Sequence, residues 1–83
     1  MKSVLITGGS RGIGAACARR FAAEGYQVAI NYCRSGEQAQ ALAAEVGGIA
    51  LKADVADPRQ VEKMVDTVLD KFCQLDILVC NAG

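Results

Sequence analysis

The chain has 83 residues, which is enough for one small domain at most. Nine basic and nine acidic side chains cancel, so no basic excess points to nucleic acid or to a membrane surface as a partner. Hydrophobic residues make up 52% of the sequence, which argues against disorder, yet no apolar run reaches the roughly 20 residues that a membrane-spanning helix needs.

The cysteines do not match a metal site or a disulfide framework. There are four of them, none forms a Cys-x-x-Cys pair, and the sequence contains no histidine. Zinc sites with histidine ligands and Ser-His or Cys-His catalytic pairs are therefore excluded from these residues. A single lysine precedes the first apolar run, so we expect no signal peptide and a cytoplasmic location. There we expect reduced thiols that fill small apolar spaces, namely Cys17, Cys33, Cys73 and Cys80.

The first predicted strand, Ser3–Thr7, runs into a glycine-rich turn, residues 7–14, with the sequence Thr-Gly-Gly-Ser-Arg-Gly-Ile-Gly. A helix is predicted over 13–24, so the glycines join a strand to a helix N-terminus. Free backbone N–H groups and the positive end of the helix dipole suit phosphate there. The turn lacks the Lys-Ser/Thr of a P-loop, which excludes that class of NTPase, and its spacing differs from G-x-G-x-x-G. A turn that binds nothing remains the alternative.

The rest of the chain alternates between strands and helices. Further strands are predicted over Gln27–Tyr32, 49–53 and 76–80, with a helix in each interval. Ser35 and Gln38 form a capping box for the second helix, and Asp57-Pro58 starts the third. The third helix carries an apolar stripe that we assign to the core: Val61, Met64, Val65, Val68, Leu69 and Phe72.

This β-α-β-α-β-α-β pattern predicts an α/β fold with a parallel sheet. The strand centres are apolar runs, which is typical of strands covered by helices on both faces. Right-handed crossovers and a change of direction before the fourth strand give the order 3-2-1-4, the first half of a Rossmann-like doubly wound sheet. Ligands bind such sheets at the carboxyl ends of the strands, where the turn and residues 81–83 both fall.

The residues after the second strand indicate the kind of dinucleotide. An acidic residue there would accept hydrogen bonds from a ribose 2′-OH and repel a 2′-phosphate. This chain has no carboxylate there but has Arg34 and Ser35, and Arg11 could reach the same phosphate. We therefore predict NADP(H) in preference to NAD(H). The alternatives are that Arg34 is only solvated and that Ser35 only caps a helix.

Asp54-Val55 follows the third strand. A carboxylate at that strand end can accept a hydrogen bond from an adenine amino group, or it can cap a turn. The sequence favours neither role for Asp54.

The glycine turn, Asp54-Val55 and Asn81-Ala82-Gly83 together resemble the short-chain dehydrogenase/reductase family over the whole chain. The resemblance implies a pyrophosphate turn at 8–14, an adenine contact at Asp54 and packing along the adenine ribose at 81–83. The implied cofactor-contacting residues are Gly8, Ser10, Arg11, Gly12, Ile13, Gly14, Asp54, Val55, Asn81, Ala82 and Gly83. The family motif begins with a second Asn where this chain has Cys80, a change that we expect to affect the sheet rather than the chemistry.

The family's catalytic residues cannot be placed in this sequence. They are a later Asn, a Ser that orients the substrate carbonyl, and a Tyr-x-x-x-Lys pair whose Tyr transfers the proton. Tyr26 and Tyr32 are followed at the fourth position by Ile30 and Gly36. The resemblance therefore implies a cofactor-binding part without catalytic residues.

We accordingly interpret residues 1–83 as an NADP-binding Rossmann domain, the N-terminal portion of a longer one and inactive alone. The parent would move hydride between nicotinamide and a small-molecule carbonyl or alcohol substrate, bind no nucleic acid or membrane, and form a homo-oligomer. A stand-alone, non-catalytic dinucleotide-binding module is the alternative. A third possibility is an interaction protein that kept the fold and lost the ligand.

Overall fold

The computed structural model describes residues 1–9, 12–34 and 36–81. Its strands form one parallel sheet in the order β3-β2-β1-β4, which confirms the predicted first half of a Rossmann-like sheet. The strands are β1 (Ser3–Thr7), β2 (Gln27–Tyr32), β3 (Ile49–Lys52) and β4 (Ile77–Cys80). The helices between them are α1 (Gly12–Ala23), α2 (Gly36–Val46) and α3 (Pro58–Phe72).

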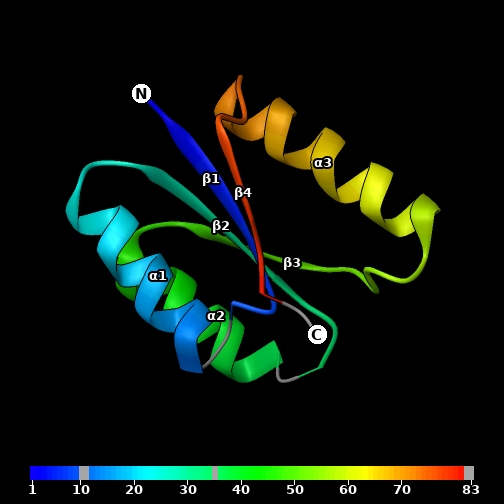
Figure 1. The fold of residues 1–83 in the computed structure, drawn as a ribbon, viewed down its shortest axis with the longest axis horizontal. Coiled ribbons are helices and arrows are strands. Elements are labelled where there is room, and N and C mark those ends of the chain that lie inside the picture. The colour runs from blue at the N-terminus through cyan, green and yellow to red at the C-terminus, as the bar shows by residue number, and fades with distance from the viewer. Residues whose placement is uncertain (10–11, 35, 82–83) are drawn as a thin grey trace.

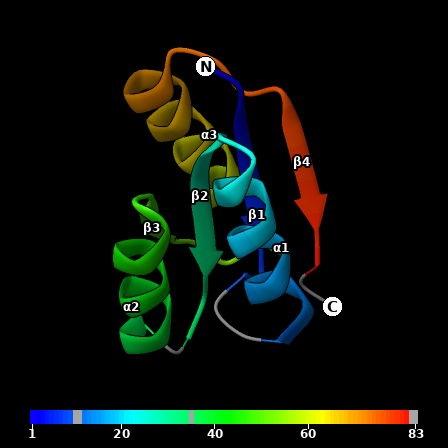
Figure 2. The ribbon, with the colours of Figure 1, turned by 90° about the vertical axis from the view of Figure 1, so that its left-hand side faces the viewer.

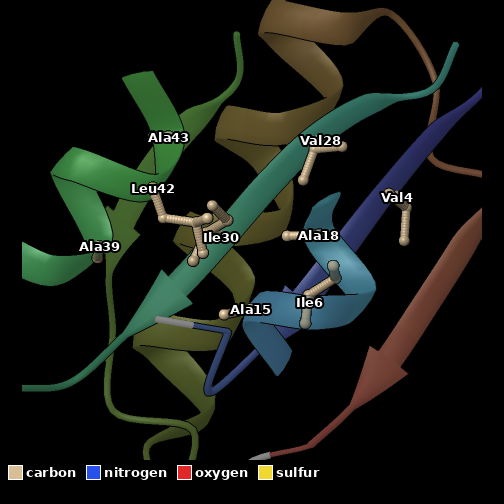
Figure 3. Close-up of a cluster of buried hydrophobic side chains, with 9 residues drawn as sticks. All are labelled: Val4, Ile6, Ala15, Ala18, Val28, Ile30, Ala39, Leu42 and Ala43. Atoms are coloured by element: carbon tan, nitrogen blue, oxygen red, sulfur yellow. The ribbon is translucent and has the colours of Figure 1, made fainter. Parts of the chain in front are cut away.

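Helices cover both faces of the sheet, with α1 and α2 on one side and α3 on the other (Figure 1). Successive residues of a strand point to opposite faces, so a sheet covered twice needs apolar side chains at every central position. Leu5 and Ala29 meet Met64 and Val68 of α3 in one core cluster. The other cluster, drawn in Figure 3, lies under α1 and α2 and contains Val4, Ile6, Ala15, Ala18, Val28, Ile30, Ala39, Leu42 and Ala43.

The strand register brings the ends of β1 and β4 together. Thr7, the last residue of β1, is the partner of Cys80, the last residue of β4. All strands run in the same direction, so their carboxyl ends share one edge of the sheet (Figure 2). The chain progresses outward from β1 to β3 and then crosses back to β4. The change of direction therefore lies between β1 and β4, as predicted.

Helix α3 begins where its sequence predicts, but one residue of its apolar stripe is exposed. Asp57 is the N-cap, and its Oδ1 accepts a hydrogen bond from the Arg59 N–H at 3.0 Å. The assignment of Leu69 to the core is wrong, because this side chain is 44% exposed at the margin of the apolar stripe. The helix ends at Cys73, which has the left-handed conformation (φ 66°). Glycine usually occupies such a position, so the sequence gives no sign of this helix end.

The cysteines also differ from expectation. Cys17 is half-buried and packs against the cluster under α1 and α2, as a small apolar filler should. The prediction is wrong for Cys33, Cys73 and Cys80, whose side chains are exposed. Cys33 and Cys73 follow the last residues of β2 and α3, where the chain leaves the packed layers, whereas Cys80 shares an exposed face of β4 with Leu78, which is 53% exposed.

Asp76 joins the start of β1 to the start of β4. Its Oδ2 accepts hydrogen bonds from the Ser3 N–H at 2.8 Å and from the Gln74 amide at 2.6 Å, and the Ser3 hydroxyl donates to the Gln74 carbonyl. The Ser3 backbone bond, followed by the Gln74 bond, lowers the pKa of the Asp76 carboxyl below its ordinary value. The ionised carboxylate is therefore the form that the fold favours.

Replacing Asp76 by Asn should lower the melting temperature at neutral pH and less so in acid. A lowered folded-state pKa gives stability that is present above the unfolded pKa of about 3.9 and is lost as pH falls through the folded value. Melting curves of the wild type and Asp76→Asn between pH 7 and pH 2 should therefore converge below about pH 4. Asp66→Asn, on the exposed side of α3, should melt at the same temperature as the wild type at every pH. If Asp76→Asn still melts at a lower temperature than the wild type at pH 2, the ionised Asp76 carboxylate is not the source of the stability.

Candidate functional site

The glycine turn between β1 and α1 has a backbone that side chains would strain. Gly8 and Gly12 have φ of 62° and 63°, in the left-handed region that residues with a Cβ rarely adopt. Helix α1 has no acidic residue in its first turn. Its N-terminal N–H groups and dipole are therefore not neutralised by a neighbouring carboxylate within the helix, an arrangement that suits an anion.

Gly14 allows the first turn of α1 to approach the end of β1 closely. A Cβ at this position would lie 2.6 Å from the Gly8 carbonyl oxygen, 2.7 Å from the Gly9 Cα and 2.8 Å from Asn81 Nδ2. Atoms do not approach so closely without displacement, and two of these three belong to the backbone. Any side chain here would therefore push α1 and the glycine turn apart.

Asn81 attaches the end of β4 to the glycine turn. Its backbone N–H donates to Thr7 Oγ1 at 3.0 Å, and its Nδ2 donates to the Gly8 carbonyl at 3.1 Å. The Thr7 hydroxyl in turn donates to the Val79 carbonyl at 3.3 Å. The backbones of β1 and β4 are thus held together beyond their ladder, at the point where the sheet changes direction.

The carboxyl ends of β2 and β3 add charged side chains to the same edge. Arg34 follows β2 and is exposed. Asp54 follows β3, and its Oδ1 accepts a hydrogen bond from the Ala56 N–H at 2.9 Å, which is the turn-capping role. Its backbone N–H donates to Gln60 Oε1 at 2.8 Å. The turn does not use Oδ2 of Asp54, so capping and a contact to a ligand are compatible.

The described candidate residues all follow carboxyl ends of strands. Ile13 and Val55 are apolar but 75% and 43% exposed, so they present hydrophobic surface beside the polar groups. The structure brings to this edge Gly8, Gly12, Ile13, Gly14, Arg34, Asp54, Val55 and Asn81. The candidates that lie outside the described residues are Ser10, Arg11, Ser35, Ala82 and Gly83.

Two polar side chains at this edge are absent from the sequence-based candidates. One is Thr7, whose hydroxyl bridges β1 and β4. The other is Asn31, which is only 2% exposed and is hydrogen-bonded to both Gly8 and Ala53. An amide one residue before the end of a mostly apolar strand is a signal in the sequence, because burying it requires partners.

The described part of the chain offers neither a metal site nor a membrane-spanning helix. Within residues 1–9, 12–34 and 36–81, no cluster of histidine, cysteine or acidic side chains could hold a metal ion. None of the helices in these ranges has the length and apolar character needed to cross a membrane.

Comparison with known proteins identifies the family. The family model of short chain dehydrogenases matches residues 2–83. The 3-oxoacyl-(acyl-carrier-protein) reductase FabG of Staphylococcus aureus strain Mu50 is 47% identical over 99% of this chain and 35% of its own length. The corresponding reductase of Synechocystis is 48% identical over 95% of this chain and 34% of its own length.

A solved structure shows the same arrangement of elements. A short chain dehydrogenase from Burkholderia cenocepacia in complex with NADP superimposes with a TM-score of 0.95. It is 54% identical over 99% of this chain, which covers 36% of that structure. The chain thus spans about a third of the length of the relatives that it matches. The match to the family model over nearly every residue shows that the chain belongs to the short-chain dehydrogenase family.

Proposed function

We propose that this chain is the NADP(H)-binding part of a short-chain oxidoreductase. The observation that carries the proposal is the glycine turn at the carboxyl end of β1, closed by Gly14 against Asn81 where the sheet changes direction. Within the described part of the chain a Cβ on Gly12 would meet nothing within 4 Å, which leaves room for a ligand beside the helix N-terminus. The residues therefore fit a dinucleotide, and the similar Burkholderia protein has NADP bound.

Each strand end would contact a different part of the cofactor. In this proposal the turn residues Gly8, Ser10, Arg11, Gly12, Ile13 and Gly14 bind the pyrophosphate. Asp54, with Val55 beside it, binds adenine, and Asn81, Ala82 and Gly83 lie along the adenine ribose. Arg34 and Ser35 bind the 2′-phosphate, which is the basis for NADP(H) over NAD(H), because no carboxylate in the sequence 31–35 would repel it.

The bound nicotinamide would exchange hydride with a carbonyl or alcohol carbon of a small molecule. The residues of this chain bind and orient the cofactor, and they include no Tyr-x-x-x-Lys pair. We therefore propose that residues 1–83 form the N-terminal part of the NADP-binding domain and are inactive alone. In this proposal the full-length protein is a cytoplasmic homo-oligomer that needs neither nucleic acid nor a membrane.

The test is carbonyl-dependent oxidation of NADPH by the full-length product of the gene. A 3-oxoacyl thioester is the first substrate to try, because the similar Staphylococcus and Synechocystis proteins are 3-oxoacyl-(acyl-carrier-protein) reductases. We expect the absorbance of NADPH to fall with the full-length protein and not with residues 1–83. Binding of NADPH by the full-length protein without oxidation by any carbonyl tested would favour a non-catalytic binding module. Absence of binding would contradict the proposal altogether.

A further inference from the structure

The side chain of Asn31 lies between the end of β1 and the end of β3. It is buried near the carboxyl end of β2, with 2% of its surface exposed. Its Nδ2 donates to the Ala53 carbonyl at 3.0 Å, and its Oδ1 accepts a longer bond from the Gly8 N–H at 3.4 Å. The Asn31 carbonyl also accepts from the Gly9 N–H at 3.3 Å. One residue therefore contacts the glycine turn and the segment that leads into Asp54.

These contacts replace strand pairing where the β1–β2 ladder has ended. The register of β1 with β2 stops at Ile6 and Ile30, so Gly8 lies beyond it. From there the Gly8 carbonyl accepts from Asn81 Nδ2 at 3.1 Å. A continuous series of amide hydrogen bonds thus crosses the carboxyl ends of all strands of the described sheet. It links Ala53 after β3, Asn31 in β2, Gly8 after β1 and Asn81 after β4.

We propose that Asn31 is a positioning residue that sets the distance between the glycine turn and Asp54. This inference rests on the proposed function, in which the turn binds the pyrophosphate and Asp54 binds adenine. A rigid dinucleotide site must hold these two groups at one separation, because misplacement of either costs affinity. Asn31 would touch no part of the cofactor and would act through Gly8 and Ala53.

A role that only fills space would not require an amide. An apolar side chain of similar volume, such as leucine, would fill the same space between β1 and β3 without the desolvation cost of a buried amide. It would leave the Gly8 N–H and the Ala53 carbonyl without this partner. The benefit of Asn31 is therefore the geometry that its two hydrogen bonds impose.

The test compares two ligands on the full-length protein. NADPH spans from adenine to the glycine turn, whereas adenosine 2′-monophosphate reaches only the adenine side. In Asn31→Leu the dissociation constant of NADPH should rise about tenfold. That of the monophosphate should rise less than about threefold, because this ligand does not reach the glycine turn and so does not depend on the distance between the turn and Asp54. Asn31→Ser adds no charge beside the 2′-phosphate, but its side chain is too short to bridge Gly8 and Ala53, so it should give the same pattern and serves if the leucine variant does not fold.

Val28→Ala provides the matched control for stability. Val28 is buried in the same strand, three positions before Asn31 and away from the carboxyl edge. This variant should lower the melting temperature and leave both dissociation constants unchanged. Equal weakening of both ligands in the Asn31 variants, or unchanged affinity for NADPH, would overturn the inference. Failure of the wild-type protein to bind NADPH would overturn the proposed function and, with it, this role for Asn31.

Discussion

Gly14→Ala should abolish most of the affinity for NADPH and destabilise the protein. The new methyl group would lie 2.6 Å from the Gly8 carbonyl oxygen and 2.7 Å from the Gly9 Cα, so α1 and the turn must separate. Overpacking of this kind costs about 1–3 kcal/mol of folding free energy. The displaced turn would also move the backbone N–H groups away from the pyrophosphate. We expect the dissociation constant of NADPH, measured by calorimetry, to rise at least about tenfold.

Two other glycines separate loss of binding from loss of stability. A Cβ on Gly48 would lie 2.2 Å from the Val28 carbonyl oxygen, but Gly48 precedes β3 at the opposite edge of the sheet. Gly48→Ala should therefore destabilise the protein without weakening NADPH binding. At Gly25 the φ is 88° and the space is open, so Gly25→Ala should cost only about 1 kcal/mol. If Gly14→Ala binds NADPH as tightly as the wild type does, the turn does not hold the cofactor.

Arg34→Glu should reverse the preference between the two nicotinamide cofactors. Arg34 is exposed after β2, and the sequence 31–35 has no carboxylate. Charge-assisted hydrogen bonds to a phosphate contribute about 1.5–3 kcal/mol, so their loss should weaken NADPH binding about ten- to a hundredfold. The new carboxylate would also repel the 2′-phosphate. NADH lacks that phosphate, so its dissociation constant should change little.

The control for this prediction is the same change of charge elsewhere. Arg20 on α1 is 78% exposed and pairs with Glu24, near the end of the helix that is remote from the glycine turn. Arg20→Glu alters the net charge by the same amount and should affect both cofactors equally and weakly, at one fixed ionic strength. If Arg34→Glu weakens the binding of NADPH and NADH to the same extent, or weakens the binding of neither, the assignment of Arg34 to the 2′-phosphate is wrong.

The sequence by itself determined the order of elements, the topology and the family. Those features depend on local patterns: apolar runs for strands covered on both faces, helical periodicity, and caps such as Asp57-Pro58. The topology followed because parallel crossovers have one hand and the apolar strands needed helices on both faces. The positions of the strand ends were then enough to predict that Gly8, Arg34, Asp54 and Asn81 lie at the carboxyl edge of the sheet.

The tertiary structure alone decided which side chains are buried and what they contact. Leu69 and all four cysteines were assigned to apolar packing from their chemistry, but Leu69 and three of the cysteines are exposed, because burial depends on the neighbouring layers. The close approach of Gly14 to Asn81 and the bonds of Asn31 to Gly8 and Ala53 join residues that are far apart in the chain. No local pattern encodes those distances, because they arise only when β1, β2, β3 and β4 are packed side by side.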